Sequence, residues 1–224
     1  MEVTSHSIYN GILESTIIGV QDLHESHDAK YLGKTLEDMC NKWSISNIVA
    51  VISDNAANIT KTIKDTFTTS GQLPCMAHTL NLVVSESLEK IGDLKLLLDN
   101  VKDIVTYFKR CVNAADDLKK ETGDDFLKPT RLVQSVVTRW NSTFCMLRRF
   151  LLLKTEVASV LSKYSKAPTM LDGGNIEILE KTCKILEPFE VVTREICGEK
   201  YETCGKIIPN VYNLLHNNRF FQAD

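Results

Sequence analysis

The chain has 224 residues, of which 43% are hydrophobic and 25% are charged, and its formal net charge is −3. This composition is typical of a globular protein, and the length suffices for one compact domain and part of a second. Apolar runs such as Phe150–Leu153 are too short to cross a membrane, and the slightly acidic charge argues against strong non-specific DNA binding.

The segment from Val3 to Asp54 has the pattern strand, strand, helix, strand. Ile12–Val20 is its clearest extended run, and the residues from Asp28 to Trp43 are predicted to form a helix. The apolar run Val49–Ser53 then predicts a buried strand that ends at Asp54. The apolar residues at helical spacing that define the buried face of the helix are Leu32, Leu36, Met39 and Cys40.

The motif SDNAANI places Asp54 between this strand and a predicted helix, whose apolar positions continue through Ile59, Ile63 and Phe67. In open α/β sheets, groups at the carboxyl end of a strand face the crevice in which ligands bind. Asp54 can therefore hold a divalent cation, or it can simply cap the helix, because Asp and Asn are favoured caps. The motif alone leaves both interpretations open.

A second motif, Cys75-Met76-Ala77-His78, follows a short strand predicted around Leu73–Cys75 and is itself followed by TLNLVV. Structural zinc needs four Cys or His ligands, and no second pair has suitable spacing, so this pair is at best half of a zinc site. A small thiol and a hydrogen-bonded imidazole at a helix start are the favoured interpretation. The seven scattered cysteines predict free thiols in a reducing compartment, the cytosol or the nucleus.

From Leu80 onward the pattern is helical almost throughout. One long amphipathic helix is predicted as far as Phe108, with a possible weak point at Gly92. Further helices are predicted from Ser142 to Ser162, from Ile176 to Ile196 with a bend or division at Pro188, and at the end around Ile207, Val211 and Leu214.

The third motif is Thr138-Arg139-Trp140-Asn141-Ser142-Thr143. A guanidinium group forks onto phosphate and an indole face accepts a base, so Arg139 and Trp140 suit contact with nucleic acid. The same pair can instead be a structural anchor that buries Trp140 and pairs Arg139 with an acidic neighbour, which composition favours. Basic residues also gather nearby, and a solvated helix face is their favoured interpretation: Lys119, Lys120, Lys128, Arg131, Arg148 and Arg149.

In this order, SDNAANI, C-x-x-HTLNLVV and TRWNSTFCMLRRF closely resemble motifs of the hAT-superfamily DNA transposases and of their domesticated relatives, the zinc finger BED domain-containing proteins. The flanks extend the resemblance over nearly the whole chain. VTSHSI is similar to the second core strand of the family, and ILESTIIGVQDLHESHDAKYLGKTLEDMCNKW to its third strand and first helix. REICGEKYETCGKIIPNVYNLL is similar to a segment inside the family's large helical insertion.

The resemblance implies a ribonuclease H-like fold with a DDE-type acidic triad that binds two divalent ions. Asp54 matches the second acid of this triad, whereas the family's first acid precedes Met1 and its third lies beyond the helical insertion. Asp22, Glu195 and Glu199 match neither position. One carboxylate cannot organise two Mg²⁺ ions, so we expect no DNA cleavage and no cofactor in this chain, and Mg²⁺ or Mn²⁺ only as part of an active transposase.

The other motif residues also acquire implied roles from the resemblance. Cys75 and His78 match a pair that shapes the nucleic-acid pocket near the active-site strand. Arg139 and Trp140 match the family's Arg-Trp pair, whose tryptophan is implied in stabilising a DNA hairpin or a flipped base.

The predicted fold is α/β plus α, with a truncated ribonuclease H-like core at residues 1–80 and an incomplete, all-helical insertion at residues 81–224. The core is expected to lack its central strand, which predicts marginal stability or dependence on a partner. Specific DNA binding is expected from a BED finger elsewhere in the parent protein. The family's dimerising segment, near its C-terminus, is expected to lie outside this chain.

The favoured function is a nuclear, transposase-derived and catalytically inactive protein that contacts DNA or another protein. The first alternative is the middle part of an active DDE-type transposase. The second, favoured least, is a cytosolic α/β enzyme that uses Asp54 with a single cation.

Overall fold

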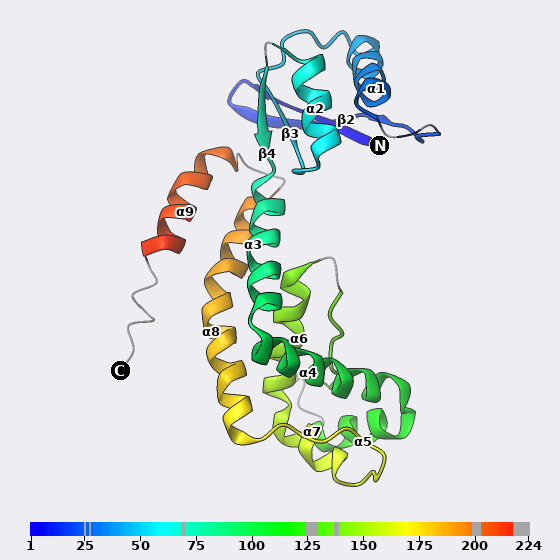
Figure 1. The fold of residues 1–224 in the computed structure, drawn as a ribbon, viewed down its shortest axis with the longest axis vertical. Helices are drawn as coiled ribbons and strands as arrows, with labels where there is room; N and C mark the ends of the chain where they lie inside the picture. Colours follow the sequence, from blue (N-terminus) through cyan, green and yellow to red (C-terminus); the bar gives the residue numbers. More distant parts are fainter. Residues whose placement is uncertain are drawn as a thin grey trace. The chain divides into compact units, whose positions relative to one another are not determined.

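In the computed structural model, the described residues are 1–24, 26, 28–68, 70–123, 130–136, 139–198 and 203–216. Helices predominate among them, and the strands form two small sheets (Figure 1). The chain divides into two compact units, one comprising Met1–Leu80 and Val192–Asp224, the other Asn81–Val191. No helix in the described part of the chain is long and apolar enough to span a membrane.

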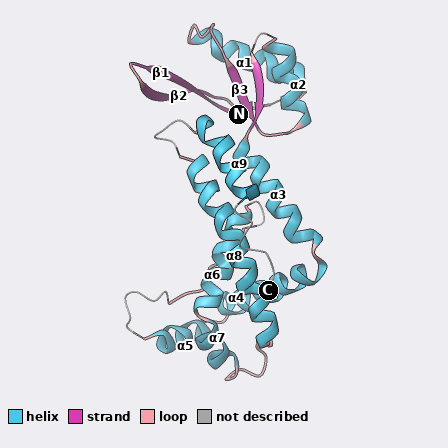
Figure 2. Ribbon diagram, turned by 90° about the vertical axis from the view of Figure 1, so that its left-hand side faces the viewer, coloured by secondary structure: helices cyan, strands magenta, loops and turns pink. Residues whose placement is uncertain are grey.

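The first sheet is an antiparallel hairpin of β1 (Glu2–Tyr9) and β2 (Ile12–Val20), drawn as paired strands in Figure 2. Its two turn residues have positive φ angles, 50° at Asn10 and 77° at Gly11. Tight hairpin turns need such angles, and Asn-Gly is the favoured pair for them. The extended run predicted at Ile12–Val20 is confirmed.

The second sheet consists of two parallel strands, β3 (Ala50–Ser53) and β4 (Gly71–Pro74). Helix α2 (Ala57–Thr66) connects them, and helix α1 (Ala29–Lys42) packs against α2. The four apolar residues predicted to face inward from α1 are all buried. Among the described residues the two sheets remain separate.

The strand predicted at Val49–Ser53 is present as β3, but the prediction that it is buried is wrong. Val49 precedes β3 and is 88% exposed, and Ile52 within β3 is 56% exposed. The physical reason is that β3 pairs only with β4 among the described strands. An apolar run favours an extended backbone, but it does not determine whether another element covers the strand.

The rest of the described chain is helical. The single helix predicted as far as Phe108 is in fact two helices, because Ile91 has an extended ψ of 93° and is 56% exposed. The helix predicted from Ser142 to Ser162 is likewise divided, at Leu153, whereas Pro188 lies within a continuous helix. The helices are α3 (Met76–Lys90), α4 (Gly92–Arg110), α5 (Val112–Thr122), α6 (Trp140–Leu152), α7 (Lys154–Leu161), α8 (Gly173–Ile196) and α9 (Ile207–His216).

The main hydrophobic core lies in the unit Asn81–Val191. Its members come from helices α3 to α8 and from Leu153 between α6 and α7, and many of them have no exposed surface. Burying one large aliphatic or aromatic side chain contributes about 1.5–3 kcal/mol, so this cluster dominates the stability of the unit. Its largest fully buried side chains include Phe144, Phe150, Ile104, Leu147 and Leu153.

Candidate functional site

Asp54 lies directly after β3, at the carboxyl end of a parallel strand. Its side chain is exposed, and its Oδ1 accepts a hydrogen bond from the Ala56 N–H at 3.2 Å. Ala56, rather than Asp54, is the N-cap residue of α2. The carboxylate therefore stabilises the turn between β3 and α2 while staying accessible to solvent.

Asn55 links this turn to the second motif. Its Nδ2 donates to Thr79 Oγ1 at 3.2 Å, and the Thr79 hydroxyl donates to the Cys75 carbonyl at 3.0 Å. In addition, the Cys75 N–H donates to the Ser53 carbonyl at 2.7 Å. These three bonds hold the end of β3, the following turn and the start of α3 together.

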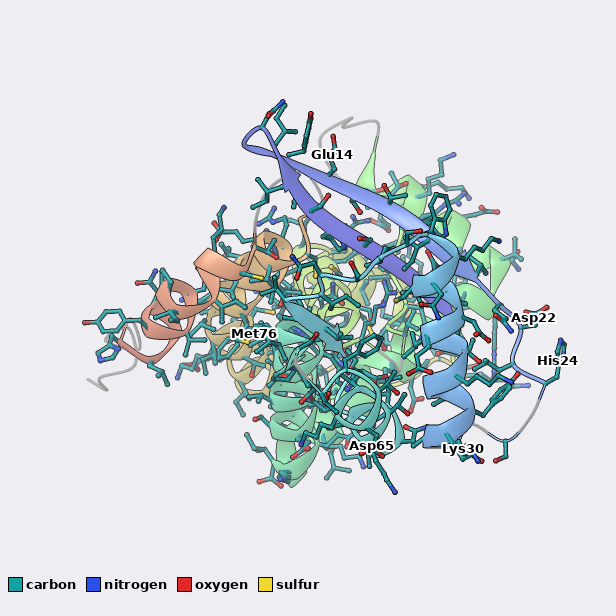
Figure 3. The ribbon with its side chains drawn as sticks, turned by 90° about the horizontal axis from the view of Figure 1, so that it is seen from above. Glu14, Asp22, His24, Lys30, Asp65 and Met76 are labelled. Carbon is teal, nitrogen blue, oxygen red and sulfur yellow. The ribbon has the colours of Figure 1, made fainter. Side chains whose placement is uncertain are left out.

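Cys75 and His78 lie at the start of α3, where both side chains are partly buried. Figure 3 labels Met76, the first residue of this helix, and also labels Asp22 in the segment between β2 and α1. Within the described residues, no group of three or more His, Cys, Asp or Glu side chains is placed to hold a metal ion. The four ligands of a structural zinc are not assembled there, and neither is a carboxylate set for two divalent ions. Glu199 lies outside the described residues.

Trp140 is the first residue of α6, and its side chain is buried in the core of its unit, with 3% exposed. The indole ring packs against Phe144, with 6.2 Å between the ring centroids. Its Nε1–H is buried and has no hydrogen-bond partner among the described residues. The Trp140 backbone N–H donates to Asn81 Oδ1, on α3, at 3.0 Å. Base stacking requires an accessible ring face, and this ring is buried. A nucleic-acid role for it therefore stays a prediction.

Arg139 is exposed and has the N-cap position of α6. Its backbone is fixed by Ser142, whose Oγ accepts the Val136 N–H at 2.7 Å and lies 2.7 Å from the Arg139 carbonyl. The segment before it is also attached to α6, because Arg149 donates to the Arg131 carbonyl at 2.9 Å. The ion pairs found among the described residues do not include Arg139.

A polar network that sequence reasoning did not single out connects α5 with α7 and the residues after it. The Tyr164 hydroxyl donates to Asp117 at 2.8 Å, and this bond raises the pKa of Tyr164 to about 12 and lowers that of Asp117. Lys163 pairs with Glu121 at 2.6 Å, which lowers the carboxyl pKa and raises the ammonium pKa. Both contacts hold α5 against the α7 region, so the network is structural.

The second motif is hydrogen-bonded to each of the other two, and each of these contacts lies within one unit. Asn55 of the first motif bonds to Thr79 of the second, and Asn81 of the second bonds to Trp140 of the third. Sequence reasoning missed Asn81, although it lies inside HTLNLVV, because nothing local indicates a partner 59 residues away. Thr138 of the third motif and Lys128 of the basic group lie outside the described residues.

Residues 73–183 match the family model described as the ZBED1 RNase-like helical domain. The chain is 27% identical over 203 residues to zinc finger BED domain-containing protein 4 of Homo sapiens, covering 89% of this chain and 17% of that protein. It is 29% identical to the putative AC transposase of Zea mays over an alignment of 225 positions, which covers 92% of this chain and 27% of that protein. The putative transcriptional regulator tpeD of Talaromyces stipitatus is 24% identical over an alignment of 237 positions, which covers 89% of this chain and 27% of that protein.

These matches confirm the resemblance found in the sequence. Residues 73–183 are thus similar to the RNase-like helical domain of this transposase-related group, and the similarity to hAT-type transposases and zinc finger BED domain-containing proteins covers 89% to 92% of the chain. It spans only 17% to 27% of the length of these relatives.

Proposed function

We propose that the chain is the middle part of a transposase-derived nuclear protein that contacts DNA and does not cut it. Residues 1–80 would form part of a ribonuclease H-like core, and residues 81–224 part of its helical insertion. The small strand-helix-strand unit of β3, α2 and β4, in which Asp54 directly follows β3, supports this division together with the long helical region after it that matches the family. The names of the relatives, a BED zinc finger protein and a transcriptional regulator, support a nuclear role.

The donor set around Asp54 supports a non-catalytic role for this chain. Strand cleavage by a DDE-type site needs several carboxylates that converge on two ions about 3.5–4 Å apart. Asp54 has no such cluster among the described residues, so the residues present do not fit a two-ion site. Mg²⁺ or Mn²⁺ would bind at Asp54 only together with the first and third acids of the family's triad, and no residue of this chain matches either of them.

The observation that carries the DNA-binding proposal is the exposed Arg139 at the start of α6. The helix N-terminus adds its own partial positive charge, and the first turn of α6 contains no acidic residue to neutralise it. A guanidinium group in this position can fork onto a phosphate. The overall charge of −3 predicts that the contact is modest and sensitive to salt.

Fluorescence anisotropy with a labelled DNA hairpin tests this proposal on the whole chain. Arg139→Ala is expected to weaken binding and to lower the salt slope by about one phosphate contact. Arg139→Lys keeps the charge but loses the fork, so an intermediate affinity is expected. Arg110→Ala, which removes an exposed arginine at the end of α4, is the matched control. Equal effects of Arg139→Ala and Arg110→Ala would contradict the proposal.

An active transposase is the second candidate, because Asp54 is accessible at the carboxyl end of a parallel strand. The test is metal-dependent cleavage of transposon-end DNA by the full-length parent protein. Loss of cleavage in Asp54→Asn, with DNA binding preserved, would establish this candidate and overturn the inactive one. Equal and undetectable cleavage by both proteins would support a binding role.

We further propose that a partner completes the strands of the first unit. The two sheets are separate among the described residues, and Ile52 and Leu73, which face each other across β3 and β4, are both exposed. Such strand edges and apolar faces associate readily with other chains. Fast amide exchange in β2 and β3 of the isolated chain is expected. Slow exchange in a monomer would refute this dependence.

A further inference from the structure

The N-terminus of α6 obtains its hydrogen-bond acceptor from another helix. The first N–H groups of a helix have no partner within it, and a side chain at the N-cap position usually accepts one of them. Arg139 occupies that position, but a guanidinium group only donates, and it makes no capping bond. Asn81 on α3 supplies the acceptor instead, with its Oδ1 3.0 Å from the Trp140 nitrogen.

This bond lies where its loss cannot easily be compensated. The contact is partly buried, and the adjoining indole is almost completely enclosed by the core. A donor left without a partner in such a place costs more than the same donor in water. The bond therefore fixes the backbone at the first residue of α6.

Arg139 is held on both sides as a result. Ser142 contacts its carbonyl oxygen, and Asn81 binds the N–H of the next residue. The exposed guanidinium thus extends from a backbone whose direction is already set. A group that starts from a fixed backbone loses less conformational freedom when it binds, which strengthens the contact.

We propose that Asn81 is a positioning residue for phosphate binding by Arg139. It acts through the Trp140 backbone N–H and does not touch the DNA. This inference rests on the proposed DNA contact of Arg139. It also assigns a role to Asn81 within TLNLVV, a motif that the predicted pocket of Cys75 and His78 leaves unexplained.

Amide exchange and DNA binding, measured together on the ¹⁵N-labelled chain, test the inference. Asn81→Ala removes the acceptor, whereas Asn81→Asp retains an oxygen at the same position. Ser87→Ala is the matched control, because Ser87 also lies on α3 but its hydroxyl bonds only within that helix, to the Val83 carbonyl. If Asn81→Ala fails to fold, Asn81→Gln replaces it, since Gln keeps the amide but shifts its oxygen by one methylene.

In Asn81→Ala, the Trp140 amide is expected to exchange about five-fold faster, the effect of losing a helix cap. Asn81→Asp and Ser87→Ala should retain the protection of wild type. Asn81→Ala should also weaken binding of a labelled DNA hairpin several-fold. Adding Arg139→Ala should weaken it no further than Arg139→Ala alone, because both changes remove the same contact.

Three results would overturn the inference, and they are distinguishable. Unchanged exchange in Asn81→Ala would show that the capping bond is not formed. Faster exchange with unchanged hairpin affinity, while Arg139→Ala still weakens binding, would make Asn81 a purely structural cap. Unchanged affinity in Arg139→Ala would instead refute the DNA contact itself, whatever Asn81 does.

Discussion

Replacing Trp140 by phenylalanine or alanine decides whether its indole is a packing group or a ligand-binding group. The ring is 3% exposed and contacts Phe144, and its N–H has no partner among the described residues. Trp140→Phe keeps one aromatic ring in the core and removes that N–H. Trp140→Ala removes the whole ring.

The structure sets the expected magnitudes. Truncating a buried aromatic residue to alanine costs about 3–5 kcal/mol, a large part of a stability of about 5–15 kcal/mol. A buried donor without a partner costs about 1–3 kcal/mol. Trp140→Phe relieves this cost while it loses the contacts of the second ring. The two effects oppose each other, and we expect a net loss below about 1.5 kcal/mol, as for other well-tolerated core replacements.

Urea unfolding should be followed by far-UV circular dichroism, because the fluorescence of the chain comes from Trp140 and from the half-exposed Trp43. Hairpin binding should be measured on the same samples. If Trp140→Phe destabilises as strongly as Trp140→Ala, the indole N–H has a partner and the reasoning from burial is refuted. If Trp140→Phe keeps its stability but loses hairpin binding, the ring is a ligand contact.

Three further predictions concern other contacts. The hydrogen bond to Asp117 raises the pKa of Tyr164 to about 12, so its contribution to stability is present below pH 10 and is lost as the pH rises through 12. The thermal unfolding temperature of Tyr164→Phe should therefore fall less over this pH range than that of wild type. Burial raises the pKa of Cys183 to about 11, so mass spectrometry should find it alkylated by iodoacetamide more slowly than the exposed cysteines at pH 8, and equal rates would contradict this. A double-mutant cycle of Asn55→Ala and Thr79→Val, measured by urea unfolding, should give a coupling of about 0.5–1.5 kcal/mol, whereas strict additivity would show that their hydrogen bond contributes nothing.

The helical periodicity predicted which residues lie inward, but it predicted helix ends less well. The inward positions of α1 are buried as expected. The sequence indicates the break at Ile91 only as a weak point at Gly92, and it does not indicate the break at Leu153. In both places apolar residues continue at helical spacing across the break. Such breaks depend on how neighbouring helices pack, which the local sequence does not contain.

Candidate site residues were predictable as motifs, but their environments were not. Composition favoured a structural anchor for the third motif, and the structure does bury Trp140. The expected acidic partner of Arg139 is not among the ion pairs of the described residues. Asn81 was invisible because its importance comes from a contact with a residue 59 positions away.

The role of the second motif can be argued from its spacing on α3. Thr79 bonds to the first motif and Asn81 to the third, and both lie on the first turns of this helix. Residues two apart on a helix are separated by about 200° around its axis, so the two side chains leave α3 in different directions. Thr79 and Asn81 can therefore each bond to a different motif from the same helix. These two hydrogen bonds account for the Thr and Asn of HTLN, and they leave Cys75 and His78 as the part of the motif whose role must be tested separately.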